Sequence, residues 1–160
     1  MDANDLQRFI DEQGIDAEMV LLQEMTPTVE AAAEAVDVRP AQIVKSVLFV
    51  IREDDGSRRP QLVVTNGLSR VDYRALAGYL DISRKRVRLA RADEVQAMTG
   101  YDVGTVPPFG HIAPVPTVLD ETVTKQRDVY AGGGSISALI RLTVAELQRV
   151  LQAEVVRLSE

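Results

Sequence analysis

The sequence predicts a single α/β domain in which helices pack outside a mixed β-sheet. The chain has 160 residues, which is about the length of one domain and is enough to bury a core without disulfides or metals. Its 46% hydrophobic and 26% charged residues are typical of an ordinary soluble globular protein. Strand-like and helix-like segments alternate irregularly and without an internal repeat, and this order favours a mixed sheet covered by helices. We expect the domain to span residues 1–160.

A β-hairpin is the clearest element in the first half of the chain. Residues 44–51 are rich in β-branched side chains, residues 53–59 contain a polar Asp-Gly turn, and residues 61–65 provide the return strand. The segments before the hairpin predict, in order, a helix over 5–13, a strand over 18–22, an alanine-rich helix over 28–36 and a helical turn opening at Pro40.

Capping signals mark the helices in the second half. Ser69 and Asp72 resemble a capping box for a helix that ends near residue 80, and Thr143 and Glu146 resemble one for a helix that ends near residue 152. The remaining segments predict a helix over 92–98, an irregular loop over 100–111, and strands over 86–89, 115–119, 128–131, 137–142 and 154–158.

The composition excludes several classes of site. The sequence contains no cysteine, which rules out disulfide scaffolds, thiolate zinc sites and cysteine nucleophiles. A single histidine, His111, cannot form a His-rich metal site or a two-histidine mechanism. The longest apolar run, residues 47–51, is far shorter than the roughly 18 residues of a membrane span, and the acidic N-terminus lacks the apolar stretch of a signal peptide. We therefore expect a cytoplasmic protein with no metal, no cofactor and no membrane contact.

Lys45 is the first candidate functional residue. In a strand it shares one face with Val47, Phe49 and Ile51, so its ammonium group lies in line with core side chains. A desolvated lysine is costly unless it is paired or lines a cleft. Lys45 could therefore be a fixed positive charge at the floor of a pocket, where it stabilises an oxyanion or holds a phosphate. The alternative is a lysine at the end of a strand that extends into water.

Two glycine-rich segments are the second group of candidates. The loop over 100–111 can present backbone N–H groups to a carbonyl or phosphate, although a plain connection is the alternative. The three glycines at 132–134 allow close approach of a ligand or another backbone, although a flexible hairpin turn is at least as reasonable. We expect a pocket between these two segments and the start of the Lys45 strand.

The remaining candidates are a basic cluster and the histidine. The net charge of −6 is not that of a dedicated nucleic-acid binder, but local patches still count. One cluster of basic residues could bind an RNA backbone or could be a solvated face; it consists of Arg84, Lys85, Arg86, Arg88 and Arg91. If it binds, it should affect affinity and not chemistry. His111 could act as a general base, or it could be a structural residue of its loop.

Three motifs, taken in order, resemble the YbaK family, also called the prolyl-tRNA synthetase insertion-domain-like family. They are Ile-Val-Lys-Ser-Val-Leu-Phe at 43–49, Gly-Tyr-x-x-Gly-x-Val-Pro-Pro-Phe-Gly at 100–110 and Tyr-Ala-Gly-Gly-Gly at 130–134. The resemblance covers nearly the whole chain. It implies a compact mixed α/β fold with a central, partly closed sheet, and hydrolysis of mischarged aminoacyl-tRNA. It also implies the acceptor end of aminoacyl-tRNA as a partner, together with an aminoacyl-tRNA synthetase in some members.

The same resemblance implies a set of site residues. Lys45 falls on the functional lysine of the family. Six further positions fall on its substrate loop and on its late glycine pair; they are Gly100, Gly104, Pro108, Gly110, Gly133 and Gly134. The chain departs from the cysteine-editing branch, which carries a serine at Gly132, an aspartate at Leu139 and a tyrosine near residues 22–26. These departures argue against specificity for cysteine but leave the lysine and the loop in place.

The chemistry available from the residues agrees with hydrolysis of an activated ester. A positioned water, a ribose hydroxyl of the substrate, a lysine and backbone N–H donors would suffice. The sequence contains no Gly-x-Ser-x-Gly nucleophile elbow. Two other interpretations stay open: a noncatalytic member that binds RNA or an aminoacyl group or regulates a partner, and a protein whose loops serve only the fold.

Overall fold

Two β-sheets form the centre of the molecule in the computed structural model, which describes residues 1–26 and 28–160. The larger sheet has the strand order β4-β2-β3-β5-β8. Its long strands β2 (Val44–Arg52) and β3 (Arg58–Asn66) form the predicted hairpin, with Val44 opposite Asn66 and Arg52 opposite Arg58. The strands added around this hairpin are short; they are β4 (Val87–Leu89), β5 (Thr117–Asp120) and β8 (Val155–Val156).

The larger sheet is mixed because the strands on the two sides of the hairpin run in different directions relative to their neighbours. β4 runs antiparallel to β2, whereas β5 runs parallel to β3 and β8 runs parallel to β5. The smaller sheet has the order β1-β7-β6 and is antiparallel throughout; its strands are β1 (Glu18–Leu21), β6 (Asp128–Gly132) and β7 (Ala138–Thr143).

The predicted fold class, an α/β domain with a mixed sheet and helices outside it, is confirmed. The expected single, partly closed sheet is instead divided into two open sheets. A parallel bridge between Ile43 and Tyr130 joins them at the start of β2. β6 contacts β2 there but does not continue as its neighbour, so no closed barrel forms.

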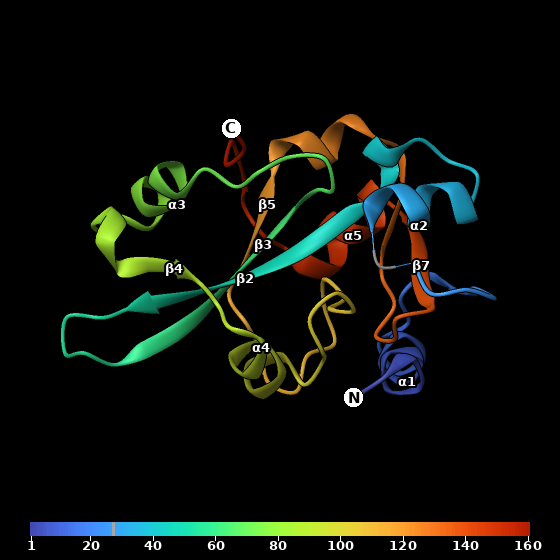
Figure 1. Ribbon diagram of the computed structural model, residues 1–160, viewed down its shortest axis with the longest axis horizontal. Coiled ribbons are helices and arrows are strands. Elements are labelled where there is room, and N and C mark those ends of the chain that lie inside the picture. Colours follow the sequence, from blue (N-terminus) through green and yellow to red (C-terminus); the bar gives the residue numbers. More distant parts are fainter. Residues whose placement is uncertain (27) are drawn as a thin grey trace.

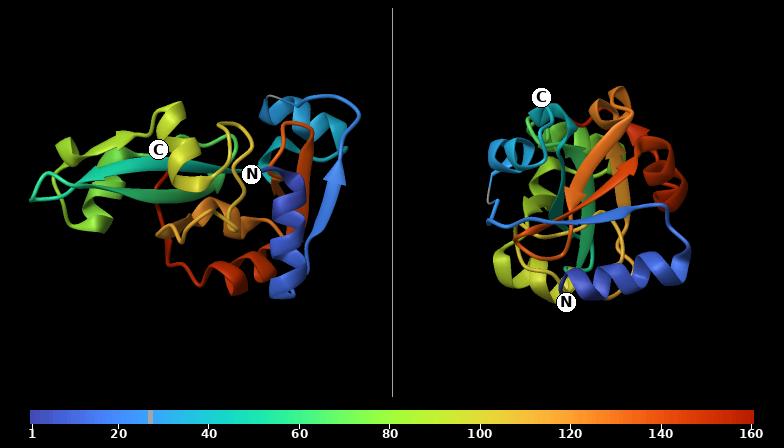
Figure 2. Two further views of the ribbon diagram at one scale, coloured as in Figure 1. Left: turned by 90° about the horizontal axis from the view of Figure 1, so that it is seen from below. Right: turned by 90° about the vertical axis from the view of Figure 1, so that its right-hand side faces the viewer.

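Helices cover both faces of the larger sheet and flank the smaller one (Figures 1 and 2). The α-helices of the described residues are α1 (Ala3–Gln13), α2 (Val29–Ala35), α3 (Tyr73–Leu80), α4 (Ala92–Thr99) and α5 (Val144–Leu151). Three short 3-10 helices connect them to the strands: η1 (Pro40–Gln42), η2 (Arg84–Arg86) and η3 (Glu121–Lys125). Within residues 1–26 and 28–160, none of the helices is both long and apolar enough to cross a membrane.

Alternation along β2 divides the core. Val44 and Leu48 face a core shared with Leu6 of α1 and Val95 of α4. The opposite face of the strand packs on α3, where Phe49 and Ile51 join Leu76 and Ala77. A third, smaller cluster packs α2 against the smaller sheet; its buried members are Ala32, Ala33, Ile43 and Leu139. Successive β2 side chains therefore lead to different parts of the molecule.

One predicted capping box forms differently and another forms only in part. Asp72, not Ser69, caps α3, and its carboxylate accepts bonds from the N–H groups of Arg74 and Ala75. Ser69 does not cap the helix because α3 begins only at Tyr73, and the intervening Val71 is held in a β-bridge with Ser159. Thr143 does cap α5, but Glu146 accepts from the Asp16 N–H and from Arg149 instead of bonding back.

Candidate functional site

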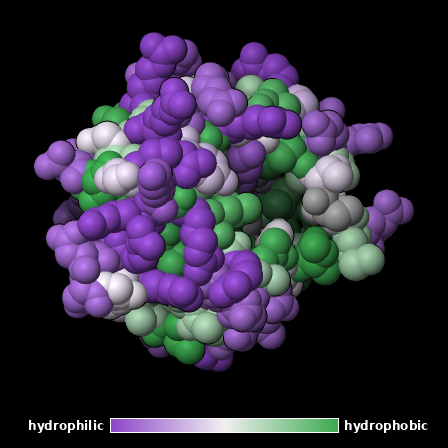
Figure 3. Space-filling model, turned by 60° about the vertical axis from the view of Figure 1, so that its left-hand side comes forward, coloured by the Kyte–Doolittle hydropathy of each residue, from purple (hydrophilic) through white to green (hydrophobic). Residues whose placement is uncertain are grey.

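A cavity of about 240 Å³ lies at the start of β2, where the two sheets meet. Its walls come from α2 and the segment before it, from β2, from the glycine-rich loop and from the ends of β6 and β7; the lining residues are Thr26, Thr28, Val29, Ala32, Ile43, Val44, Lys45, Ser46, Gly104, Val106, Gly132 and Leu139. A space-filling view shows a hollow with an apolar floor on one face of the molecule, with hydrophilic side chains along one side of it (Figure 3).

Lys45 supplies the charge of this cavity. It is half-buried and lies opposite Thr65 in the ladder. Burial lowers the pKa of its ammonium group, and the positive charge of Arg70 lowers it further. Among the described residues no carboxylate forms an ion pair with it. The protein therefore keeps a partly desolvated cation at a cavity wall without neutralising it, and an anionic ligand can use that charge.

Ser46 supplies an unpartnered hydroxyl, and sequence analysis missed it. Its side chain leaves β2 on the face opposite to Lys45, and both residues line the cavity. The Oγ of Ser46 is buried and has no hydrogen-bond partner among the described residues. Leaving such a group unpaired costs about 1–3 kcal/mol. A ligand in the cavity would recover the cost if the Ser46 side chain rotated toward it and the hydroxyl formed a hydrogen bond.

Gly132 brings the glycine-rich loop to the cavity. A Cβ at this position would lie 2.4 Å from the carbonyl oxygen of Val106, so only glycine lets the end of β6 pass this close to the loop. The Gly134 N–H donates to the Thr105 carbonyl at 3.0 Å and fixes the same contact. Gly104 adopts a left-handed φ of +86°, which favours glycine. Lys45, Gly104 and Gly132 thus surround one space.

The other predicted site residues lie outside the lining of this cavity. Gly100 caps α4 and lies beside Met1, and Gly110 packs against Leu6 and Phe9 of α1. Pro108 lines a separate cavity of about 560 Å³ on the α1 side of the loop.

Gly133 and Gly134 also lie outside this lining, although they neighbour Gly132. Gly133 lies against the Ala138 backbone in the hairpin between β6 and β7, and Gly134 lies against the Asp2 backbone with a φ of +88°. For the four glycines among these five positions the structure supplies packing reasons that sequence spacing could not distinguish from ligand contact.

His111 supports the loop from within. Its Nε2–H donates to the Pro107 carbonyl at 2.8 Å, and burial lowers the pKa of the ring below its usual value. The Tyr101 hydroxyl donates to the Gly110 carbonyl at 3.1 Å, and the Tyr101 ring meets the His111 ring edge to face. His111 lines the cavity on the α1 side and not the one that contains Lys45.

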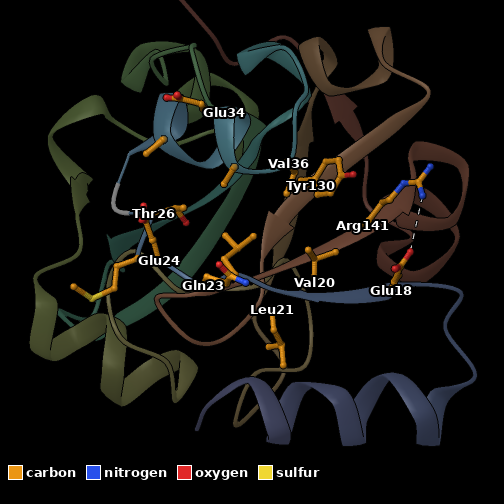
Figure 4. Close-up of a pocket in the computed structure, with 14 residues that line it drawn as sticks. Glu18, Val20, Leu21, Gln23, Glu24, Thr26, Glu34, Val36, Tyr130 and Arg141 are labelled. Carbon is orange, nitrogen blue, oxygen red and sulfur yellow. Dashed lines mark ion pairs between the residues drawn. The ribbon is translucent and has the colours of Figure 1, made fainter.

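A larger groove of about 750 Å³ lies between β1, the segment after it and α2 (Figure 4). Its charged side chains are Glu18, Glu24, Glu34 and Arg141, and the arginine is paired with Glu18 at 3.9 Å. Carboxylates in excess repel a phosphate backbone. The smaller cavity with Lys45 is therefore the better candidate for a nucleic-acid ligand.

Metal-ligating side chains do not gather at either place. Across the part of the chain that the structure describes, no group of three or more His, Asp or Glu side chains is positioned to hold an ion.

The fold and this cavity define a class of protein, and comparison with known proteins identifies its family. Residues 23–150 match the model of the aminoacyl-tRNA editing domain, and the chain belongs to that family. A solved structure described as "Crystal structure of a putative trans-editing enzyme for prolyl tRNA synthetase" superimposes with a TM-score of 0.88 at 34% identity, covering 99% of this chain and 96% of that one.

Other relatives have the same fold or contain it as a part. The hypothetical protein APE2540 has a TM-score of 0.87 and 31% identity, with 98% of this chain and 99% of that chain covered. The uncharacterized protein YwhH of Bacillus subtilis is 30% identical over 75% of this chain and 72% of its own length. Proline–tRNA ligase of Limosilactobacillus fermentum is 26% identical over 71% of this chain, but the match spans only 20% of that enzyme. The Lys45 cavity is therefore a site in a protein of the aminoacyl-tRNA editing-domain family.

Proposed function

We propose that the protein hydrolyses mischarged aminoacyl-tRNA, acting in trans as a free deacylase. The observation that carries the proposal is the ammonium group of Lys45, which lines a cavity without a carboxylate partner in a chain of the editing-domain family. The lysine is suited to an anionic or developing anionic group, and the acceptor end of tRNA offers both a phosphate and an ester carbonyl.

The reaction needs only a positioned water and charge stabilisation. The water oxygen bonds to the ester carbonyl carbon, and the carbon–oxygen bond to the terminal ribose breaks. The ribose oxygen leaves with a proton, and the amino acid is released as a carboxylate after it loses its proton to solvent. Lys45 and the backbone N–H of Gly104 offset the charge that develops on the carbonyl oxygen. The free ribose hydroxyl beside the ester orients the water, and Ser46 holds the aminoacyl group in place.

The cavity lining favours a small, uncharged amino acid. Six lining side chains are aliphatic: Val29, Ala32, Ile43, Val44, Val106 and Leu139. A charged amino-acid side chain would lose its hydration there without gaining a partner.

A panel of mischarged tRNAs, incubated with the purified protein, tests the proposal. Release of amino acid from a tRNA that carries a small aliphatic residue is expected, with slower or no release from one that carries a charged residue. Tight binding without release from any member of the panel would contradict hydrolysis and support a noncatalytic binding role.

A further inference from the structure

A fourth cavity, of about 190 Å³, is lined almost entirely by cations. Its lining consists of Val50 and five basic side chains: Arg52, Arg58, Lys85, Arg86 and Arg88. We call these five residues and the space between them the basic groove. Sequence analysis had found only the members between 84 and 91. The fold adds Arg52 and Arg58 because β4 pairs antiparallel with β2, which places Arg88 opposite Val50.

The groove concentrates like charges where packing gives no reason to do so. Arg52 and Arg58 are directly opposite each other at the end of the hairpin, and like charges in that relation destabilise a sheet. Both side chains are exposed, so uncharged polar residues would fill the positions at lower cost. Two opposed arginines at this place therefore point to a ligand and not to the fold.

Acidic residues neutralise only part of this charge. Glu94 holds Arg88 through two hydrogen bonds of 2.7 and 2.8 Å, and Asp54 pairs with Arg86. Among the described residues, Arg52, Arg58 and Lys85 form no ion pair. In a protein with a net charge of −6, this groove is a local positive site that attracts an anion which the rest of the surface repels.

The groove and the Lys45 cavity share one strand. Ser46 and Arg52 are six residues apart on the same face of β2, which corresponds to roughly 20 Å at about 3.3 Å per residue. In Figure 1 the hairpin extends away from α2, so the two sites lie at opposite ends of β2. A ligand that occupies both must be an extended polyanion and not a single nucleotide.

We propose that the basic groove binds the phosphate backbone of the double-stranded stem of the tRNA whose aminoacyl end occupies the Lys45 cavity. This inference rests on the proposed function for the choice of RNA. Arginine forks bind phosphate oxygens in pairs, and double-stranded RNA is recognised largely through its shape, its phosphates and its 2′-hydroxyls. The groove thus contributes affinity that does not depend on base sequence.

The test compares the double variant Arg52→Gln/Arg58→Gln with the control Arg8→Gln/Arg157→Gln, which removes the same charge from exposed arginines outside the groove. Fluorescence anisotropy with a labelled stem-loop of the tRNA acceptor arm that carries no amino acid measures binding directly. The groove variant should bind at least roughly tenfold more weakly than wild type and lose about two units of the logarithmic salt slope. The control should change by much less.

Kinetics then separate this proposal from the proposed function. For a mischarged tRNA, KM should rise in the groove variant while kcat stays unchanged; for a short aminoacyl-adenosine, which cannot reach the groove, neither should change. Equal stem-loop affinity and salt slope in wild type and groove variant would overturn the groove assignment even if hydrolysis is found. Binding of inorganic phosphate at the groove without any stem-loop binding would also overturn it. Loss of stem-loop binding in the variant would support the groove even if no tRNA is hydrolysed.

Discussion

Lys45 is the residue on which the proposed chemistry depends. A half-buried ammonium group beside Arg70 is kept at a cost in desolvation and repulsion, and no ion pair among the described residues offsets it. Removing a preorganised group that stabilises charge in the transition state lowers the rate by about 10²–10³. Lys45→Ala should therefore fold normally and deacylate at least about a hundredfold more slowly in single-turnover assays of the best mischarged tRNA.

The matched control for this prediction is Lys125→Ala, because Lys125 is exposed and lies outside the cavity. It should keep the wild-type rate. Lys45→Arg should also be slow, since a planar guanidinium does not replace a compact ammonium group in a small site. A folded Lys45→Ala protein with a near wild-type rate would remove the lysine from the mechanism.

Ser46 allows a second residue-level prediction, because its hydroxyl forms no hydrogen bond among the described residues. The buried Oγ lacks a partner, so Ser46→Ala should raise the free energy of unfolding by up to about 3 kcal/mol, or leave it unchanged where lost packing offsets the gain. If the hydroxyl bonds to the aminoacyl group, the same variant should deacylate roughly tenfold more slowly. Denaturant unfolding and single-turnover hydrolysis measure the two effects. A stability loss with an unchanged rate would show that the hydroxyl serves the fold.

At the scale of elements, one buried carboxylate ties the end of the larger sheet together. Asp120 ends β5 and is fully buried. Its Oδ2 accepts from the Thr65 and Thr122 hydroxyls, and its Oδ1 accepts from the Leu158 N–H at 2.7 Å. Asp120→Ala would leave these donors buried without an acceptor and should lower the free energy of unfolding by about 3 kcal/mol.

Chemical denaturation monitored by circular dichroism measures this loss. Asp120→Asn keeps one acceptor oxygen and should lose less stability than the alanine variant. Amide hydrogen exchange at Leu158 should accelerate in both variants. Equal stability of Asp120→Ala and wild type would mean that the segment around β8 is held without this carboxylate.

Local patterns predicted those elements whose partners are near in sequence. The hairpin of β2 and β3 follows from β-branched strands and an Asp-Gly turn. The N-cap role of Thr143 follows from its position before the helix α5. The pairing of β1 with β7 could not be predicted, because more than a hundred residues separate partners such as Met19 and Ile140. The division into two sheets depends on such distant contacts.

The same limit applies to the candidate site. The strand pattern identified Lys45, but only the folded chain reveals that Ser46 lacks a partner and that Gly132 lies against Val106. The separation of Gly104 from Gly110 likewise follows from packing on α1 and not from spacing in the loop. Distant contacts also joined Arg52 and Arg58 to the cluster at 84–91.

At the scale of the whole molecule, positive charge lies near both ends of β2. An acidic protein presents one unpaired lysine at the start of β2 and five cations at its other end. Under the proposed function, the apolar cavity would select the amino acid and the basic groove would bind the nucleic acid, so the two kinds of selection would occur at separate places. This arrangement predicts that the chemical step responds to changes around Lys45, whereas salt acts mainly on binding.

The chemical resources of the whole chain also lead to a prediction about metals. With no cysteine and one histidine, which is bonded inside its loop, the remaining ligands are carboxylates, and these suit magnesium rather than zinc. Carboxylates that hold a metal ion beside the reacting ester would have to line the Lys45 cavity, yet its lining includes none. Hydrolysis should therefore proceed at the full rate in excess chelator, measured with tRNA folded beforehand so that loss of RNA structure does not affect the result. A rate that falls in chelator with prefolded tRNA, and returns when magnesium is added, would contradict the lysine-centred mechanism.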